Sequence, residues 1–572
     1  MKKTNIYLSI FSFFLIFSCQ QAPQVPQAPN YTIQKSTVAD SAMVVSPHPL
    51  ASDIGVAILK KGGNAVDAVC AVQIALAVVF PRAGNIGGGG FMVYRAANGA
   101  LDALDYRERG PAAADRDMYL DSLDNIIPGL STKGHLASGV PGTVDGMVQA
   151  HAKYGDLEWS EIIQPAIDLA RQGYAITQAE ADRLNRFQED FRLFNQDDSP
   201  FIKSKWMPGH ILKQKNLART LRRIRNQGRA GFYEGKTAKF IVEEMKMGGG
   251  IITAEDLSNY KATWRIPLVG NYKDYKVISM PPSSSGGVAL LQLLEMVESY
   301  PLAEYGFHSP EAIHLMAEAE RRVYADRSAY LGDTDYYPVP IDSLLDSLYL
   351  VQRMGDFALA TASVSDATKA GDFTLTKESF ETTHTSIIDQ EGNAVSITTT
   401  LNSNFGSKVL VHGGGFFLNN EMDDFSSKPG VPNQFGLVGA EANAIAPGKR
   451  MLSSMTPTIV EKDGEVFMVL GAPGGSTIIT AVFQVMINVM EFGMPLDEAV
   501  QASRFHHQWL PDLITMEKEG FSAETIAALK DLGHNIREIE RMAVIKAIHQ
   551  MEDGKLHGAA DPRNPDDDAK GF

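Results

Sequence analysis

The stretch ETTHTSIIDQEGNAVSITTTLN, residues 381–402, predicts a β-hairpin. Two runs rich in β-branched residues flank the turn QEGN, in which Gly392 can take the positive φ that such a turn needs. A three-residue turn places Asp389 opposite Asn393. Residues 361–381, which precede the hairpin, are short of large apolar side chains and rich in Ser, Thr, Ala and Asp, so we expect an exposed, flexible segment there.

The same hairpin register gathers three polar side chains at one edge of the sheet. Counting back along the ladder places Thr382 opposite Thr400 and close to Asn402. Threonine is also an ordinary residue on the solvated face of a strand. The cluster alone therefore does not establish a site.

A second segment, EVFMVLGAPGGSTIITAVFQVMINVM (residues 465–490), leads from a strand at 466–470 through a glycine loop into a long helix. Ser476 or Thr477 could cap that helix. Backbone N–H groups of Gly474 and Gly475, at a helix N-terminus, can point at a developing negative charge, as an oxyanion hole requires. A tight strand-to-helix connection without a ligand fits these residues equally well.

Between these segments lie groups that suit both ends of a zwitterion. Acids beside amides fit a solvated turn, a cation site or a binder of an ammonium group, although their spacing is not that of a calcium loop. Ser453 and Ser454, with an arginine from elsewhere, would suit a carboxylate. The acids and amides are Asn419, Asn420, Glu421, Asp423 and Asp424.

Length and charge limit the remaining possibilities. The 572 residues can form a large core or two to three lobes, in which apolar runs of strand length alternate with helical patterns such as residues 311–333. This predicts an α/β or α+β layered architecture. A net charge of −16, without a Lys/Arg run beyond the first three residues, argues against nucleic acid. GNIGGGGFMVYR (84–95) has its strand after the glycines, the reverse of a phosphate-binding loop.

The N-terminus predicts export. Lys2 and Lys3 precede a short apolar run at 6–17, and LIFSC ends in Cys19, which suits lipid attachment after removal of a signal peptide at 1–18. A plain secretory signal with an incidental cysteine is the alternative. Residues 19–40 then form the lipidated cysteine and a Pro/Gln-rich tether. The other cysteine, Cys70, lies in a strongly apolar helical pattern, so we expect it to be buried.

Several motifs, in this order along the chain, resemble those of the γ-glutamyltranspeptidases. The family belongs to the N-terminal nucleophile hydrolases, so the resemblance implies an α+β fold, a four-layer αββα sandwich built from two subunits of one autocleaved precursor. The large subunit would span residues 41–381 and the small subunit 382–572. The motifs are GNIGGGGFMVYR, DYRERGP, SGVPGTVDGM, PPSSSGGVALLQLLE, ETTHTSIID, TTTLNSNFG, LNNEMDDFS, LSSMTPT, GAPGGS and RFHHQWLP.

The resemblance implies cleavage between Glu381 and Thr382, in which the Thr382 Oγ attacks the Glu381 carbonyl. The physical logic is independent of the name. A threonine hydroxyl is a poor nucleophile, but an α-amine on the same residue, with a pKa of about 7.7 to 8.0, can take its proton near neutral pH. That amine exists only once the preceding peptide bond is cut.

The resemblance also implies the other roles. Thr400 would orient Thr382, and Gly474 and Gly475 would form the oxyanion hole. The donor's ammonium and carboxylate groups would each have three partners, and neither a metal nor a cofactor is expected. The ammonium partners would be Asn402, Glu421 and Asp424, and the carboxylate partners Arg107, Ser453 and Ser454.

The implied substrates are glutathione and other γ-glutamyl compounds, with water, amino acids or peptides as acceptors. The two subunits would form a heterodimer in the periplasm or cell envelope of a bacterium, touching the membrane only through the lipid on Cys19. One departure concerns the lid, where many bacterial relatives have a tyrosine and this chain has Phe435, which can cover the pocket but cannot donate a phenolic hydrogen bond.

Two other readings stay open at this point. A β-lactam acylase or a poly-γ-glutamate depolymerase would share the threonine machinery. A non-catalytic surface lipoprotein would keep the scaffold and use it only to bind peptides. Arg107, the two serines and a full lid favour the γ-glutamyl enzyme over the first, and the intact nucleophile speaks against the second.

Overall fold

The predicted hairpin forms in the computed structural model, which describes residues 29, 31–368 and 382–572. Strands β10 (Thr383–Ile388) and β11 (Ala394–Thr400) pair with Thr383 opposite Thr399, so the predicted register is confirmed. Gly392 has a φ of 86°, and the Asp389 N–H donates to the Asn393 carbonyl at 3.1 Å. The signal peptide, Cys19, most of the tether, Glu381 and the rest of 369–381 lie outside the described residues.

The hairpin forms the centre of a seven-stranded sheet. All residues of β10, β11 and β3 are buried, since the sheet is covered on both faces. The strand order is β19 (Asp568–Gly571), β2 (Met43–Ser46), β10, β11, β3 (Gly89–Arg95), β4 (Leu101–Asp105) and β7 (Thr263–Arg265).

A second seven-stranded sheet packs face to face on the first. Ser396 of β11 links the two sheets, because its Oγ donates to the Leu470 carbonyl at 2.9 Å and accepts from the Thr458 N–H at 2.9 Å. The strand order is β1 (Ser36–Ala39), β18 (Leu556–Ala560), β17 (Lys546–Gln550), β13 (Glu465–Gly471), β12 (Thr458–Lys462), β9 (Tyr275–Ser279) and β8 (Leu268–Tyr272).

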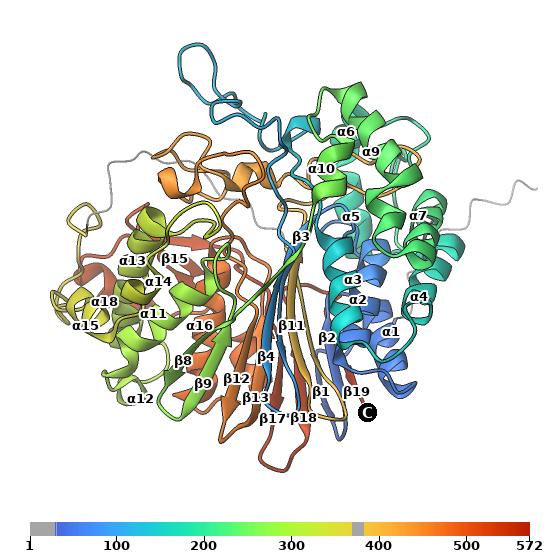
Figure 1. Ribbon diagram of the computed structural model, residues 1–572. Coiled ribbons are helices and arrows are strands. Elements are labelled where there is room, and N and C mark those ends of the chain that lie inside the picture. The colour runs from blue at the N-terminus through green and yellow to red at the C-terminus, as the bar shows by residue number, and fades with distance from the viewer. Residues whose placement is uncertain (1–28, 30, 369–381) are drawn as a thin grey trace, which may run out of the picture.

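Helices cover the two outer faces and complete the predicted four-layer αββα sandwich (Figure 1). On one side α1 (Pro49–Lys60) and α2 (Ala65–Val79) pack on the hairpin sheet. On the other side α11 (Gly286–Glu298) and α16 (Thr477–Met490) pack on the second sheet, and α13 (Pro310–Tyr330) packs on α11. Every residue of α2 is buried, including Cys70 as predicted.

Helix α2 shows how the local sequence fixes an element of the core. Asn64 accepts from the N–H groups of Val66 and Asp67, while the Asp67 carboxylate accepts from the Asn64 N–H, which is a capping box. The apolar residues that follow leave no polar face, so the helix is stable only between other layers.

No helix among the described residues has the length and apolar character to cross a membrane.

The remaining elements surround the sandwich. The region 150–260 is mainly helical, with α4 (Trp159–Gln172), α5 (Gln178–Arg186), α6 (Gln188–Phe194), α7 (Lys215–Gln227), α8 (Ala230–Tyr233), α9 (Gly235–Gly248) and α10 (Ala254–Asn259). The others are α3 (Thr143–Tyr154), α12 (Leu302–Tyr305), α14 (Ile341–Leu344), α15 (Ser347–Arg353), α17 (Leu496–Gln501), α18 (Ala523–Asp531), β5 (Tyr174–Ala175), β6 (Ile211–Leu212), β14 (Phe505–His506), β15 (Ile514–Glu517) and β16 (Ile536–Ile539).

Candidate active site

Thr382 lies directly before β10, where two cavities meet. Its side chain is 7% exposed and lines both of them. Eight of the ten predicted catalytic and substrate-binding residues line the first cavity: Thr382, Arg107, Thr400, Asn402, Asp424, Ser453, Ser454 and Gly475. Of the other two, Gly474 lines the second cavity and Glu421 is buried against Arg107. The fold therefore gathers the predicted residues around one threonine.

The glycine loop contributes one residue to each of the two cavities that Thr382 lines. It connects β13 to α16, and Gly474 and Gly475 have φ values of 152° and 56°. A side chain at Gly474 would lie 2.5 Å from Ala543, so the loop has no room for a larger residue there. Ser476 makes no side-chain capping hydrogen bond, but the Thr477 Oγ1 donates to the Gly474 carbonyl at 2.8 Å. Gly474 and Gly475 therefore lie close to Thr382, each lining one of its two cavities, directly before the N-terminus of α16.

The end of the partner strand fixes Thr400 and Asn402. Thr400 Oγ1 accepts from the Asn402 N–H at 2.7 Å, which directs the hydroxyl proton away from that N–H. Asn402 has a φ of 73°, a left-handed conformation that asparagine tolerates. Its amide nitrogen donates to the Asn420 carbonyl at 3.0 Å, so its side-chain oxygen is the group that can accept from a ligand.

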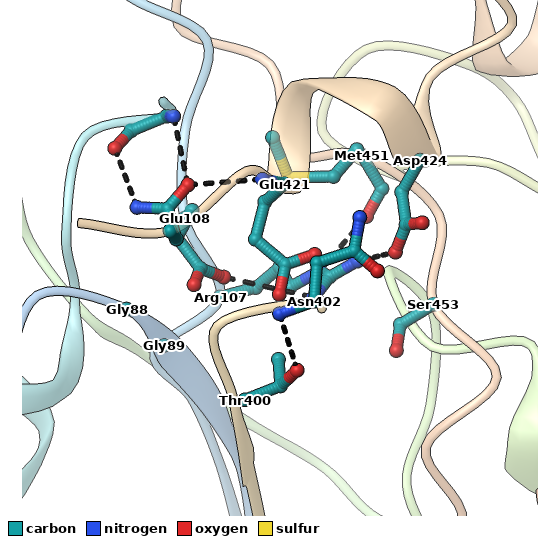
Figure 2. A network of polar contacts seen from close by, with 12 residues as sticks. Gly88, Gly89, Arg107, Glu108, Thr400, Asn402, Glu421, Asp424, Met451 and Ser453 are labelled. Carbon is teal, nitrogen blue, oxygen red and sulfur yellow. Dashed lines mark hydrogen bonds and ion pairs between the residues drawn. The ribbon is translucent and has the colours of Figure 1, made fainter. Parts of the chain in front are cut away.

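Arg107 forms the centre of a buried charge cluster, where its guanidinium lies between Glu108 and Asp424 (Figure 2). Nη2 donates to Asp424 Oδ2 at 2.5 Å, and Nη1 lies 2.9 Å from Glu421 Oε2 and 3.6 Å from Glu108 Oε2. The sequence suggested Arg107 for one end of a zwitterion and the two acids Glu421 and Asp424 for the other. In the structure these groups pair with one another.

Burial shifts the pKa values of this cluster. It raises the pKa of Glu108 to about 8, and it raises the pKa of Glu421 and Asp424 although Arg107 opposes the shift. Burial alone would lower the pKa of Arg107, but the three acids raise it above the ordinary value. Glu421 is fully buried, which excludes the solvated turn that its sequence context also allowed.

Two serines lie on the other side of the cavity, and both hydroxyl oxygens accept hydrogen bonds from the protein. The Met455 N–H donates to Ser453 Oγ at 3.1 Å, and Arg327 Nη2 donates to Ser454 Oγ at 3.1 Å. A hydroxyl that accepts in this way has its own proton to donate. Both serines are therefore prepared for an acceptor such as a carboxylate oxygen.

The sequence did not identify Arg327 or Glu108 as site residues. Arg327 lies in the last turn of a long helix, α13. Nearly every side chain of this helix is buried, so no amphipathic pattern distinguishes Arg327 from a packing residue. Glu108 stands beside Arg107 in DYRERGP, and only the fold shows that its carboxylate lies against the same guanidinium.

Phe435 covers the cavity beside the glycine loop. Its side chain is buried and lines the cavity, and a Cβ added at Gly475 would lie 2.9 Å from its Cδ1. Neighbouring contacts hold the covering segment, since the Gln434 N–H donates to Asp423 at 3.1 Å and the Gln508 amide donates to the Gly436 carbonyl at 3.2 Å.

Comparisons with known proteins identify the family of the chain. The family model described as Gamma-glutamyltranspeptidase matches residues 51–571. The sequence is 46% identical, over the full length of both chains, to the glutathione hydrolase proenzyme of Escherichia coli (strain K12). It is 34% identical to the acylase ACY 1 proenzyme of Pseudomonas sp. (strain V22), covering 94% of this chain and 95% of that one.

Solved structures show the same relationship. The cephalosporin acylase from Bacillus halodurans superposes with a TM-score of 0.81 at 25% identity, covering 98% of this chain and 99% of that one. A γ-glutamyltranspeptidase chain from Helicobacter pylori matches with a TM-score of 0.55 at 44% identity, covering 60% of this chain and 97% of that one.

Proposed function

The chain belongs to the γ-glutamyltranspeptidase family of N-terminal nucleophile hydrolases, and on that premise we propose that it is an autoprocessed enzyme that cleaves γ-glutamyl amides such as glutathione. The γ-glutamyl group passes to water or to the amine of an amino acid or peptide. These reactions correspond to glutathione hydrolase (EC 3.4.19.13) and γ-glutamyltransferase (EC 2.3.2.2). One observation carries the proposal: Thr382 shares a cavity with Arg107, Asp424 and the serine pair.

Maturation creates the catalytic base. The Thr382 Oγ attacks the Glu381 carbonyl, the Glu381–Thr382 peptide bond breaks as an ester forms, and water then hydrolyses the ester. The products are a large subunit that ends at Glu381 and a small subunit that begins with the free amine of Thr382. The position of Thr382 between two cavities supports this step, since water and substrate can both reach it.

The reaction with the donor repeats the same chemistry. The Thr382 amine takes the Oγ proton, Oγ attacks the γ-carbonyl, and the leaving amine departs with that proton as the γ-glutamyl ester forms. Thr400 orients the nucleophile from the opposite strand position. The N–H groups of Gly474 and Gly475 stabilise the oxyanion. Water or an acceptor amine then releases the glutamyl group.

Specificity comes from the two ends of the glutamyl group. Asp424, Glu421 and Asn402 bind the α-ammonium, and Arg107, Ser453 and Ser454 bind the α-carboxylate. A pocket that offers both signs of charge at fixed positions favours an acyl group with a matching amine and carboxylate, because only such a group gains an interaction at both ends. This distinguishes the γ-glutamyl enzyme from the related acylases.

Two measurements test the proposal. The purified protein should run as two fragments, the smaller with the N-terminal sequence TTHTS, and it should release p-nitroaniline from γ-glutamyl-p-nitroanilide. A single uncut band without turnover would support the binding lipoprotein instead. A preference for acyl groups that lack the α-amine would support an acylase.

The N-terminus adds a proposal on location. We infer that Cys19, which lies outside the described residues, carries a lipid that anchors the exported enzyme in the bacterial cell envelope. In the native host Cys19→Ser should therefore move the protein from the membrane to the soluble fraction, while turnover per molecule stays the same. Identical fractionation of both forms would exclude the anchor.

A further inference from the structure

Arg327 reaches the donor cavity from the last turn of α13. Its side chain is 4% exposed and lines the cavity together with Arg107 and Asp424. Nε donates to Ser285 Oγ at 2.9 Å and Nη2 donates to Ser454 Oγ at 3.1 Å. Both of these partners are neutral hydroxyl groups, so neither neutralises the guanidinium.

The other deeply buried arginines of the described chain differ from Arg327 in this respect. Each of them lies within 4.0 Å of a carboxylate oxygen, whereas the described residues place no carboxylate that close to Arg327. An isolated buried charge is costly, because desolvation is not repaid by an ion pair. The paired arginines are Arg95, Arg107, Arg321, Arg322, Arg450 and Arg504.

The end of α13 compensates only part of this charge. A cation in the last turn interacts favourably with the helix dipole, which is equivalent to roughly half an elementary charge. Burial nevertheless lowers the pKa of Arg327 below the ordinary arginine value, although Tyr324 and Asp424 oppose the shift. The remaining positive charge faces a cavity in which Arg107 is already paired with two acids.

Arg327 also sets the direction of a hydroxyl proton. Ser454 Oγ accepts from the guanidinium, so the Ser454 O–H can donate to a ligand in the cavity. A carboxylate oxygen both accepts such a bond and supplies the negative charge that Arg327 lacks. An ammonium group would be repelled there.

We propose that Arg327 determines specificity for the α-carboxylate of the donor, by holding Ser454 as a hydrogen-bond donor and by supplying a second positive charge in the cavity that Arg107 also lines. The inference rests on the proposed function and deepens it, because it names the groups that read one end of the γ-glutamyl donor. Arg107 and Arg327 then flank the carboxylate, and Asp424 takes the ammonium.

Inhibition constants of three compounds against γ-glutamyl-p-nitroanilide hydrolysis test this role. L-Glutamate carries both α-groups, glutarate lacks the amine and 4-aminobutanoate lacks the α-carboxylate. In Arg327→Gln we expect the constants for glutamate and glutarate to rise by about tenfold or more, the size of a lost charge-assisted hydrogen bond. The constant for 4-aminobutanoate should change less than about twofold. Inhibition constants do not depend on how much of a preparation is active.

A variant that keeps the charge and a control variant at another arginine complete the design. Arg327→Lys should give values between those of wild type and Arg327→Gln, since it keeps the charge but not the planar fork. Arg171→Gln is the matched control, because Arg171 is exposed on α4 and pairs with Asp168 one turn away. It should match wild type for all three compounds.

The outcomes separate the inference from the proposed function. A wild-type protein without γ-glutamyl hydrolysis would overturn the function before any variant is made. A matured Arg327→Gln enzyme with unchanged constants, or with equal rises for all three compounds, would overturn the inference alone. If Arg327→Gln does not mature, Arg327→Lys decides: the ratio of the 4-aminobutanoate constant to the glutamate constant must fall by about threefold, and an unchanged ratio overturns the proposal.

Discussion

The two ends of the candidate active site are built in different ways. The nucleophile end uses neighbouring positions of one hairpin, where the register that pairs Thr383 with Thr399 also brings Thr382 to Thr400. The recognition end draws on segments far apart in the chain, and Arg107 and Asp424 are separated by 317 positions. A local strand pairing therefore places the proposed nucleophile beside Thr400, whereas the packing of the whole sandwich places the proposed recognition groups.

Their electrostatics differ as well. The nucleophile end consists of hydroxyl groups and backbone N–H groups, which need no counter-ion. The recognition end holds two arginines and three acids in a buried space, and burial raises the pKa values of those acids. Substitutions at the first end should therefore change the rate of the chemical step, and substitutions at the second end should change which donor is accepted.

The largest effect is expected at Thr382, because this residue is both the proposed nucleophile and the residue that starts maturation. Thr382→Ala should remain a single chain without measurable turnover, because both the nucleophile and the maturation step are lost. Thr382→Ser keeps a hydroxyl and should still produce two fragments. Gel electrophoresis and N-terminal sequencing measure this, and a wild-type protein that is active while uncut would contradict the mechanism.

Substitutions that remove a charge at the recognition end should leave maturation intact but lower activity toward the donor. Arg107→Ala or Asp424→Asn removes one partner of a buried ion pair, which typically costs about 2 to 5 kcal/mol. We expect kcat/KM for γ-glutamyl-p-nitroanilide to fall by roughly thirty-fold to several thousand-fold. Both variants should still mature. A matured variant with kcat/KM near that of wild type would show that other groups hold the zwitterion.

A smaller effect is expected at Thr400, which orients rather than reacts. Thr400→Val keeps the shape but removes the oxygen that accepts from the Asn402 N–H. A misplaced nucleophile should lower kcat by roughly tenfold to a hundredfold, with little change in KM. Thr400→Ser retains the oxygen and serves as the control. A change confined to KM would assign Thr400 to the recognition end instead.

The smallest effect is expected at Phe435, which covers the recognition end. Phe435→Tyr adds a phenolic hydroxyl that can form one hydrogen bond, worth about 0.5 to 1.5 kcal/mol. We expect the ratio of transfer to hydrolysis, measured with and without a dipeptide acceptor, to change by about twofold to tenfold. Phe435→Leu keeps an apolar cover and provides the comparison. Equal ratios in all three proteins would show that the lid does not govern acceptor entry.

Local patterns in the sequence predicted the parts of the fold that depend on short-range rules. The alternation of β-branched residues and the turn at Gly392 fixed the hairpin, and the apolar run around Cys70 predicted a buried helix. The structure confirms both. The sequence offered Ser476 or Thr477 as the cap of α16; in the structure Ser476 makes no side-chain capping hydrogen bond, and the Thr477 hydroxyl donates to the Gly474 carbonyl.

By itself, the sequence determined the hairpin register, the glycine loop before α16 and the residue types that suit a zwitterion, because each depends on positions close together in the chain. Only the tertiary structure decided that Arg107 pairs with Glu421 and Asp424, and that Arg327 lies beside Ser454 with no carboxylate of the described residues within 4.0 Å. The physical reason is that buried charges interact through space. Their partners are chosen by how the layers pack, and no local pattern in the sequence records that choice.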